Sequence, residues 1–386
     1  MGFHMQGPVG AQTILNGRLV DYFAGSGYLG LQNHPAVLQA AAAAVQQYGF
    51  STATSRGGYG EHPLYDALEE EACAYFAAAK ILYFASGYMG PSILTQANGG
   101  LRDHYFIDAA AHFSLWDAAY LTNQPITPFQ HASPERLAAY LHSELDAGER
   151  PVVLSDGLFP ISGEIAPLPD YLELVRPFGG LVYLDDAHAL GVLGAHGRGT
   201  AEYYHITDES CCTSGTFDKA LGGYGGVIWG AAHWVDALDR NSRICVGSSP
   251  PPLTAAAVTA RALALARTEP ALRQQLWANV ALARSGLRAL GWDLPDTPAP
   301  IVCLEGREGL NLAQIKAALF AQDIAIEHIH SYTSAPPGGA LRIAIFATHT
   351  PPQIERLLDA LSRQVSLKNK PSPMGTRRRL DERKQG

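Results

Sequence analysis

The stretch Thr216-Phe217-Asp218-Lys219-Ala220-Leu221-Gly222-Gly223 places a lysine in a glycine-rich turn, shortly after the strand-like run Ser210-Cys211-Cys212-Thr213. A second stretch, Asp185-Asp186-Ala187-His188, lies upstream and directly follows the apolar run Leu181-Val182-Tyr183-Leu184. Short apolar runs of this kind, bounded by turn residues, are typical of buried strands. The sequence therefore predicts two strands, the first ending in an aspartate and the second leading to a lysine.

An aspartate and a lysine at successive strand ends suit pyridoxal phosphate (PLP). This cofactor needs a lysine amine for its Schiff base and a carboxylate that keeps its pyridine nitrogen protonated, so that the ring can accept electrons. An ordinary solvated lysine is the alternative for Lys219, and a carboxylate that caps the next turn is the alternative for Asp185. The order and spacing of the two stretches favour the cofactor site.

Composition limits the class of protein. The chain has 386 residues, 47% hydrophobic and 17% charged, which is typical of a globular enzyme large enough for two domains. The net charge of −8 argues against nucleic acid as a partner. No apolar run is long enough to span a membrane, and the start has no signal-peptide pattern. The five cysteines are odd in number and lack the paired spacing of a zinc site, so we expect no metal and a cytoplasmic location.

Apolar runs alternate with helical periodicity, which predicts an α/β fold with a mainly parallel sheet. We expect strands at 81–84, 105–108, 152–155, 181–185, 211–215 and 227–229. We expect helices at 35–48, 63–78, 134–147 and 169–178, several with proline near the start, where its missing N–H costs nothing.

A different region follows the proline-rich segment 248–252. A single long helix is expected at 253–290, followed by a small sheet from 301–304, 324–327 and 341–345 with two helices. The last residues are basic, polar and nearly without apolar side chains, which predicts disorder, with an electrostatic anchor as the alternative. The expected division is an N-terminal segment 1–40, a large cofactor domain 41–250, a small domain 251–366 and a disordered basic tail 367–386.

Several segments together resemble one family, the α-oxoamine synthases, and the match extends from Tyr28 to Leu361. The resemblance implies a fold-type-I PLP-dependent transferase like aspartate aminotransferase, with a mainly parallel seven-stranded sheet and a small C-terminal α+β domain. The matching segments occur in family order and are Tyr28-Leu29-Gly30-Leu31 with His34-Pro35, Ser55-Arg56-Gly57-Gly58 with His62, Ser86-Gly87-Tyr88, His112-Phe113-Ser114, Gly163-Glu164-Ile165-Ala166-Pro167-Leu168, Asp185-Asp186-Ala187-His188, Thr216-Phe217-Asp218-Lys219 and Leu341-Arg342-Ile343.

The resemblance also implies roles for single residues. Lys219 would carry the cofactor and then act as general base, and Asp185 would pair with the pyridine nitrogen. His188 would bond the phenolic oxygen, and His112 would stack on the ring. Arg342 would bind the amino-acid carboxylate with two parallel hydrogen bonds. For the two histidines and Arg342, purely structural roles are the alternatives.

The cofactor phosphate needs donors. Ser86-Gly87-Tyr88 opens an expected helix, where backbone N–H groups converge on an anion. The resemblance adds the hydroxyl of Thr216 and, from across a homodimer interface, that of Ser248. A plain turn is the alternative for the tripeptide, and a plain loop is the alternative for Ser248.

The sequence departs from the family in two places. Gly27 stands where most members have Asn, and Phe159-Pro160-Ile161 stands where most have Phe-Ser-Met. Both changes remove polar contacts near the amino-acid carboxylate and the phenolic oxygen, so the identity of the amino acid is left open. The run His112-Phe113-Ser114-Leu115-Trp116 also resembles the branch that makes α-hydroxyketone autoinducers, which uses a bulkier amino donor.

The expected activity is a decarboxylative condensation of a small amino acid with an acyl-CoA or acyl-carrier thioester. The products would be an α-aminoketone, carbon dioxide and a free thiol. An aminotransferase or another amino-acid-modifying enzyme on the same fold is the enzymatic alternative. A regulatory subunit of a heterodimeric synthase is the non-enzymatic one, although Lys219, Asp185 and His188 are all present.

Overall fold

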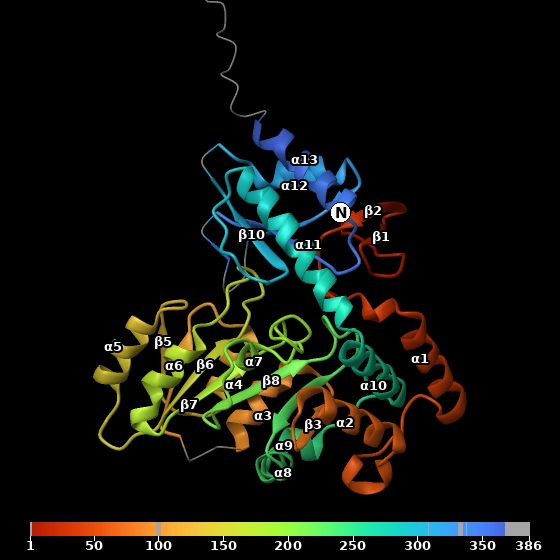
Figure 1. Ribbon diagram of the computed structural model, residues 1–386. Coiled ribbons are helices and arrows are strands. Elements are labelled where there is room, and N and C mark those ends of the chain that lie inside the picture. Colours follow the sequence, from red (N-terminus) through yellow and green to blue (C-terminus); the bar gives the residue numbers. More distant parts are fainter. Residues whose placement is uncertain (1, 98–101, 308, 331–334, 337, 367–386) are drawn as a thin grey trace, which may run out of the picture.

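The computed structural model describes the chain except residues 1, 98–101, 308, 331–334, 337 and 367–386. The predicted disordered tail therefore lies outside the described residues. Figure 1 shows a large lower part built on one sheet and a smaller upper part, with α11 (Pro270–Ala289) running between them.

The large sheet has seven strands, and six of them run in the same direction. The spatial order is β3 (Lys80–Phe84), β9 (Gly226–Gly230), β8 (Cys211–Thr216), β7 (Leu181–Asp185), β6 (Pro151–Asp156), β4 (His104–Asp108) and β5 (Ile126–Phe129). The strand β9 is antiparallel to both of its neighbours, β3 and β8, whereas β8, β7, β6, β4 and β5 pair in parallel. This confirms the predicted mainly parallel seven-stranded sheet.

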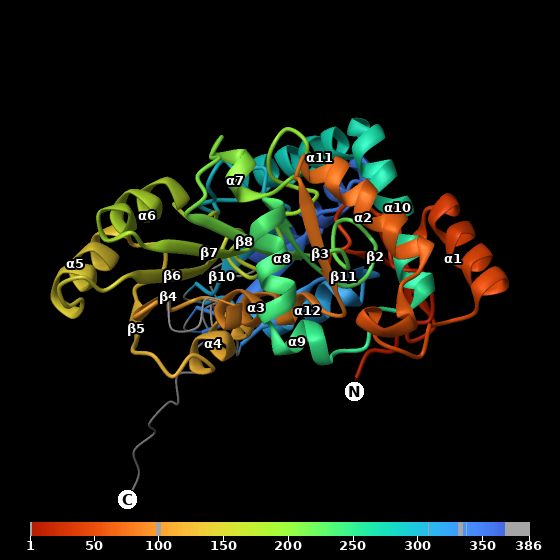
Figure 2. The same cartoon turned by 90° about the horizontal axis from the view of Figure 1, so that it is seen from below.

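Both faces of this sheet are buried, which explains why its strands read as unbroken apolar runs. On β6, Val152 and Leu154 pack into one core cluster and Val153 packs into another on the opposite face. Helices cover the two faces, as Figure 2 shows from below. They are α2 (Pro63–Phe76), α3 (Gly90–Ala97), α4 (Phe113–Tyr120), α5 (Pro134–Glu144), α6 (Leu168–Val175), α7 (Thr200–Tyr203), α8 (Ala232–Asn241) and α9 (Arg243–Gly247).

The expected single helix over 253–290 is wrong. The chain forms α10 (Leu253–Thr268) and α11 (Pro270–Ala289), separated by Glu269 in a non-helical conformation with φ −117° and ψ 71°. The reason is Pro270, because its ring disfavours the helical conformation for the residue before it. The break lets α10 pack on α2 and on α1 (Pro35–Tyr48) while α11 continues toward the upper part.

The expected single small sheet is also wrong in part. The strands β10 (Ile301–Glu305) and β12 (Glu327–Ile329) both pair with β13 (Ala340–Ala344), and all pairs are antiparallel. The segment 324–327, however, is split at the buried Ile326. Its first half, β11 (Ile324–Ala325), pairs instead with the N-terminal hairpin, in which β1 (Gln12–Leu15) precedes β2 (Arg18–Tyr22).

The small domain has the two helices expected, α12 (Leu312–Phe320) and α13 (Pro351–Ser366). The parallel pairing of β11 with β2 ties the start of the chain to this C-terminal region. The three boundaries between the four predicted segments stay a prediction.

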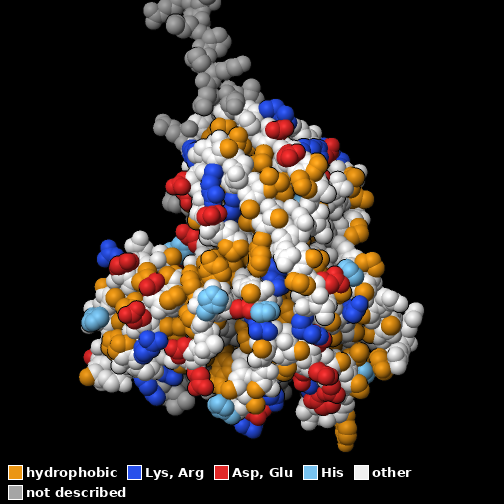
Figure 3. All heavy atoms as spheres, in the orientation of Figure 1, with side chains coloured by type: hydrophobic (Ala, Val, Ile, Leu, Met, Phe, Trp, Pro, Cys, Tyr) orange, Lys and Arg blue, Asp and Glu red, His pale blue; other side chains and the backbone are white. Residues whose placement is uncertain are grey.

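Two further observations concern the apolar character of the helices and the charge of the surface. Across the described residues, none of the helices combines the length and apolar character needed to cross a bilayer. On the described part of the face drawn in Figure 3, Lys and Arg side chains alternate with Asp and Glu rather than forming one basic patch.

Candidate functional site

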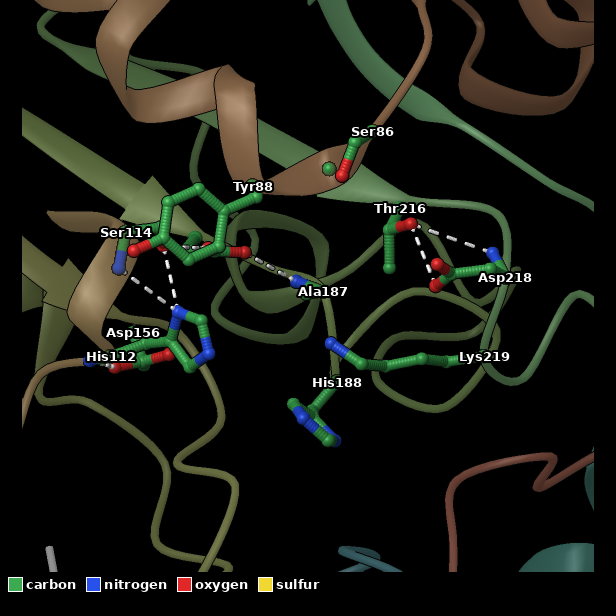
Figure 4. A pocket seen from close by; sticks show the side chains of 12 residues that line it. Ser86, Tyr88, His112, Ser114, Asp156, Ala187, His188, Thr216, Asp218 and Lys219 are labelled. Atoms are coloured by element: carbon green, nitrogen blue, oxygen red, sulfur yellow. Dashed lines mark hydrogen bonds between the residues drawn. The ribbon is translucent and has the colours of Figure 1, made fainter. Parts of the chain in front are cut away.

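Eight of the ten predicted site residues line one cavity of about 180 Å³. The cavity lies beyond the carboxyl ends of β6, β7 and β8, which is where ligands bind in open α/β sheets. Figure 4 shows Lys219 reaching into the space between Thr216 and His188, with His112 and Asp156 on the far side. The residues brought together are Lys219, Asp185, His188, His112, Ser86, Gly87, Tyr88 and Thr216.

Lys219 lies in the turn that joins β8 to β9. Its carbonyl accepts a hydrogen bond from the N–H of Gly222, which has a φ of 63° in the left-handed region that favours glycine. Burial lowers the pKa of the Lys219 ammonium, although the carboxylates of Asp185 and Asp218 act in the opposite direction. An amine with a lowered pKa is more often neutral and therefore a better nucleophile and base.

Two buried carboxylates end neighbouring strands. Asp185 on β7 and Asp156 on β6 occupy the same level of the parallel ladder. Asp185 accepts hydrogen bonds from the N–H of Ala187 (2.9 Å) and the hydroxyl of Ser114 (3.3 Å). Asp156 accepts one from the backbone N–H of His112 (2.8 Å). Burial and then the nearby Asp185 charge raise the pKa of Asp156 well above its usual range.

Asp156 was not predicted, although it follows the apolar run 152–155 just as Asp185 follows its own run. The same pattern, an aspartate directly after a strand-like run, could have identified Asp156 from the sequence. Ser114 and Ala187 also line the cavity, and they belong to the motifs His112-Phe113-Ser114 and Asp185-Asp186-Ala187-His188.

His112 caps the start of α4. Its Nδ1 accepts the N–H of Ser114 (3.2 Å) and lies 2.8 Å from the hydroxyl of the same residue. Burial lowers the pKa of His112, which favours the neutral ring. A neutral, planar side chain fixed at one nitrogen is suited to packing against the face of an aromatic ligand.

His188 follows β7 and is 8% exposed. Its Nδ1 lies 2.8 Å from the hydroxyl of Tyr28, a contact between residues far apart in the sequence. Burial, with Lys219 and Arg342 nearby, holds the pKa of His188 well below its usual range. Nothing in the sequence indicated this partner.

The turn after β3 contains Ser86 and Gly87, two residues predicted to hold the cofactor phosphate. Ser86 precedes a short 3₁₀ turn at Gly87–Met89 that leads into α3, and its side chain makes no cap hydrogen bond. A Cβ on Gly87 would lie 2.6 Å from the Cβ of Thr216, so only glycine allows the two segments to approach. In this arrangement the Thr216 hydroxyl bonds Asp218 (2.8 Å) and the carbonyl of Gly225 (3.1 Å).

These residues fit the cofactor predicted from the sequence. A buried lysine amine, a buried carboxylate and backbone N–H groups at a glycine turn border the same cavity. They match the aldehyde, the pyridine nitrogen and the phosphate of PLP respectively. No group of three or more His, Cys, Asp or Glu in the described part of the chain is arranged to hold a metal ion.

Arg342 lies outside this cavity. It sits on β13, is 4% exposed, and pairs with Glu327 at 3.0 Å. Its Nε donates to the carbonyl of Pro160 (2.7 Å) and its Nη1 to that of Gly25 (3.2 Å). The guanidinium is thus already held by several acceptors, and the predicted pair of bonds to a carboxylate would require some of them to be exchanged.

Ser248 lies at the end of α9 and lines a different cavity of about 570 Å³, together with Arg56 and Pro250. The structure of the single chain does not bring Ser248 to Lys219. The predicted contact across a dimer interface stays a prediction.

The two departures from the family pattern have local structural consequences. A Cβ on Gly27 would lie 2.5 Å from Nε2 of Gln32, so a larger residue there would displace that side chain. Pro160 contributes its carbonyl to Arg342, and its neighbour Phe159 is fully buried.

Comparisons with known proteins agree with this geometry. The family model described as aminotransferase class I and II matches residues 23–361. An 8-amino-7-oxononanoate synthase from Trichlorobacter lovleyi is 34% identical, covering 91% of this chain and 90% of that protein. Another from Methylococcus capsulatus is 33% identical, covering 94% and 93%.

Among solved structures, a serine palmitoyltransferase variant from S. paucimobilis, with a bound PLP–myriocin aldimine, superposes with a TM-score of 0.87 at 25% identity. The match covers 95% of this chain and 93% of that chain. The chain therefore belongs to the class I and II aminotransferase family and, within it, to the α-oxoamine synthases, which are PLP-dependent transferases of fold type I.

Proposed function

We propose that this protein catalyses the decarboxylative condensation of a small amino acid with an acyl-CoA or another acyl thioester. The products are an α-aminoketone, carbon dioxide and a free thiol. The observation that carries the proposal is the cavity in which Lys219 faces Asp185, His112 and His188. The name of the relatives supports the product class, because 8-amino-7-oxononanoate carries its amine and its ketone on adjacent carbons.

The residues that border the cavity would have distinct roles in the reaction. When bound, PLP supplies an aldehyde for the amine and a ring that stabilises negative charge at the substrate Cα. Asp185, held by Ser114 and Ala187, would keep a proton on the ring nitrogen. The amine of Lys219 would take the proton from the substrate Cα and later return one, a role that its lowered pKa favours.

The remaining residues would bind and orient. His112 would cover one face of the ring, and Ser86 with the N–H groups of Gly87 and Tyr88 would hold the phosphate. Arg342 would bind the substrate carboxylate after giving up part of its present contacts. We also propose a cytoplasmic homodimer in which Ser248 reaches the phosphate site of the partner.

The stoichiometry of the products tests the reaction. With amino acid and acyl thioester both present, one carbon dioxide should be released for each thiol freed. Mass spectrometry of products from mixed amino acids and thioesters would identify the pair used. Thiol release without matching carbon dioxide would mean hydrolysis or a non-decarboxylating transfer, and would overturn the proposal.

An aminotransferase is the second candidate, and the description of the matching family model favours it. Incubation of the holoenzyme with amino acid alone separates the two. An aminotransferase would release one keto acid per site without any thioester, whereas the proposed synthase would exchange only the α-proton. A regulatory subunit would do neither, and the presence of Lys219, Asp185 and His188 in one cavity argues against it.

A further inference from the structure

Tyr28 lies behind the cavity, outside its lining, and is fully buried. Its hydroxyl oxygen lies 2.8 Å from Nδ1 of His188 and 3.4 Å from Nη2 of Arg342. The hydroxyl therefore joins a histidine that borders the cavity to an arginine that comes from the small domain.

The number of hydrogens on each group determines which atom donates in the two hydrogen bonds of the Tyr28 hydroxyl. A guanidinium only donates, so the Tyr28 hydroxyl accepts the bond from Arg342. The hydroxyl hydrogen then needs an acceptor of its own, and within the described ranges Nδ1 of His188 is the one in reach. Leaving a buried donor unsatisfied is costly, so Tyr28 donates to Nδ1 and that nitrogen carries no hydrogen.

The ring of His188 is neutral, because burial and the positive charges of Lys219 and Arg342 hold its pKa well below its usual range. A neutral imidazole has one ring hydrogen, and with Nδ1 occupied as an acceptor it must sit on Nε2. His188 borders the cavity, and no hydrogen-bond partner for its Nε2 is found among the described residues.

We propose that Tyr28 is a positioning residue that fixes His188 in the tautomer with hydrogen on Nε2, so that His188 presents a donor to an oxygen of the ligand at Lys219. The proposal rests on the proposed function in one respect, since the phenolic oxygen of PLP is the acceptor that this donor fits. Because the same hydroxyl bonds Arg342, Tyr28 also couples the proposed carboxylate site to the cofactor site.

The tautomer can be observed directly in the holoenzyme labelled with ¹⁵N in its histidine rings, using His188→Asn to assign the signals. Nδ1 of His188 should be unprotonated and Nε2 protonated in the unaltered protein. Tyr28→Phe should populate the other tautomer. A hydrogen on Nδ1 in the unaltered protein would overturn the proposal, even if the variant failed to fold.

The colour of the holoenzyme supplies a second readout. A donor to the phenolic oxygen stabilises its anionic form and lowers the pH at which the lysine-bound chromophore loses its proton. In Tyr28→Phe this midpoint should rise, on the order of one pH unit. An unchanged midpoint would count against the proposal.

Tyr75→Phe is the matched control. Tyr75 is also buried, at 2% exposed, but its hydroxyl donates to the carbonyl of Gly197 (2.8 Å) outside the cavity. This variant should leave both readouts unchanged. If the cofactor were not attached to Lys219, the proposed function would fail, whereas the ¹⁵N signals of His188 would still decide the role of Tyr28.

Discussion

At Lys219, burial and three surrounding carboxylates act in opposite directions on one amine. Burial lowers the pKa of the ammonium, while Asp185, Asp218 and Asp156 favour the charged form. The Lys219 amine therefore loses its proton more easily than a surface lysine does. It also stays close to the three carboxylates. Both properties suit a residue that must carry a cofactor and then move a proton.

Lys219→Ala should abolish the yellow absorbance of the purified protein, because no amine would remain in the cavity to bind the cofactor aldehyde. Borohydride reduction of the unaltered protein, followed by peptide mapping, should attach the cofactor to the peptide that contains Lys219. Lys316→Ala, in α12 and away from this cavity, should keep its colour. Labelling of any other lysine would disprove the assignment.

Arg342→Lys should weaken amino-acid binding more than cofactor binding. A lysine retains charge but cannot offer two parallel donors to a carboxylate. The lost charged hydrogen bond is worth on the order of 1.5–3 kcal/mol. Absorbance titration with amino acid measures this affinity, and the unliganded spectrum measures cofactor binding. Glu327→Gln, which removes only the acidic partner of Arg342, is the comparison. Unchanged amino-acid affinity in Arg342→Lys would assign Arg342 a structural role.

At the scale of elements, the turn between β3 and α3 is held close to β8. A side chain on Gly87 would meet Thr216 at 2.6 Å, so the turn could not keep its place. Gly87→Ala should weaken cofactor binding on the order of tenfold, since overpacking of this kind costs about 1–3 kcal/mol. Equilibrium dialysis of the cofactor measures the change. Gly10→Ala, where the nearest atom would be 3.8 Å away, is the control and should bind normally.

Three loops at the carboxyl edge of the sheet are joined by His131. Its Nδ1 lies 3.0 Å from Asp108 at the end of β4, and its Nε2 lies 2.6 Å from Glu164 in the turn after β6. The same turn contains Pro160, whose carbonyl binds Arg342. Burial alone would lower the pKa of His131, but hydrogen bonds to Asp108 and Glu164 raise it to about 9.

This shift predicts a pH dependence of stability. Because the folded pKa lies above the ordinary value of 6.5, the contribution of His131 is fully present below about pH 6.5 and is lost as the pH rises through about 9. The free energy of unfolding, measured with urea across this pH range, should decline as the pH rises, and this decline should be absent in His131→Gln. If the free energy of unfolding changed with pH equally in the two proteins, the ion pairs of His131 would contribute nothing measurable to stability.

At the scale of the whole molecule, the small domain reaches the large one through Arg342 on β13. Arg342 donates hydrogen bonds to Gly25, Tyr28 and Pro160, all of which lie far from it in the sequence. Within one chain, Ser248 lines a cavity separate from that of Lys219. The proposed contribution of Ser248 to the phosphate site would therefore come from a second copy of the chain.

Mixing of inactive variants tests the dimer. Lys219→Ala combined with Ser248→Ala should regain activity, since one of the two mixed sites would take an intact Lys219 from one chain and an intact Ser248 from the other. Lys219→Ala combined with Arg342→Ala should stay inactive, because both residues belong to the same site of the same chain. A stable, active monomer in sedimentation would contradict the dimer.

The elements of the large sheet were largely predictable. Strands buried on both faces must be apolar throughout, so β7 could be located from its composition, and prolines marked the starts of α1, α2 and α5. The break at Glu269 was missed because the helical periodicity continues on both sides of Pro270. The division of 324–327 was missed because the partner of β11 is an N-terminal strand, and pairing partners leave no local signal.

Most residues that border the cavity of Lys219 could be predicted from the order of strands and motifs along the chain. Asp185 ends β7 and Lys219 follows β8, and the parallel pairing of these strands brings their carboxyl ends to one edge of the sheet, so the two residues meet because of the order of elements. The groups that support these two residues could not be predicted in this way. The contacts of Tyr28 with His188, and of Arg342 with Pro160, join segments far apart in the chain. Such contacts depend on how the small domain packs on the large one. A local pattern of residues does not indicate how distant segments pack together, so these contacts could not be predicted.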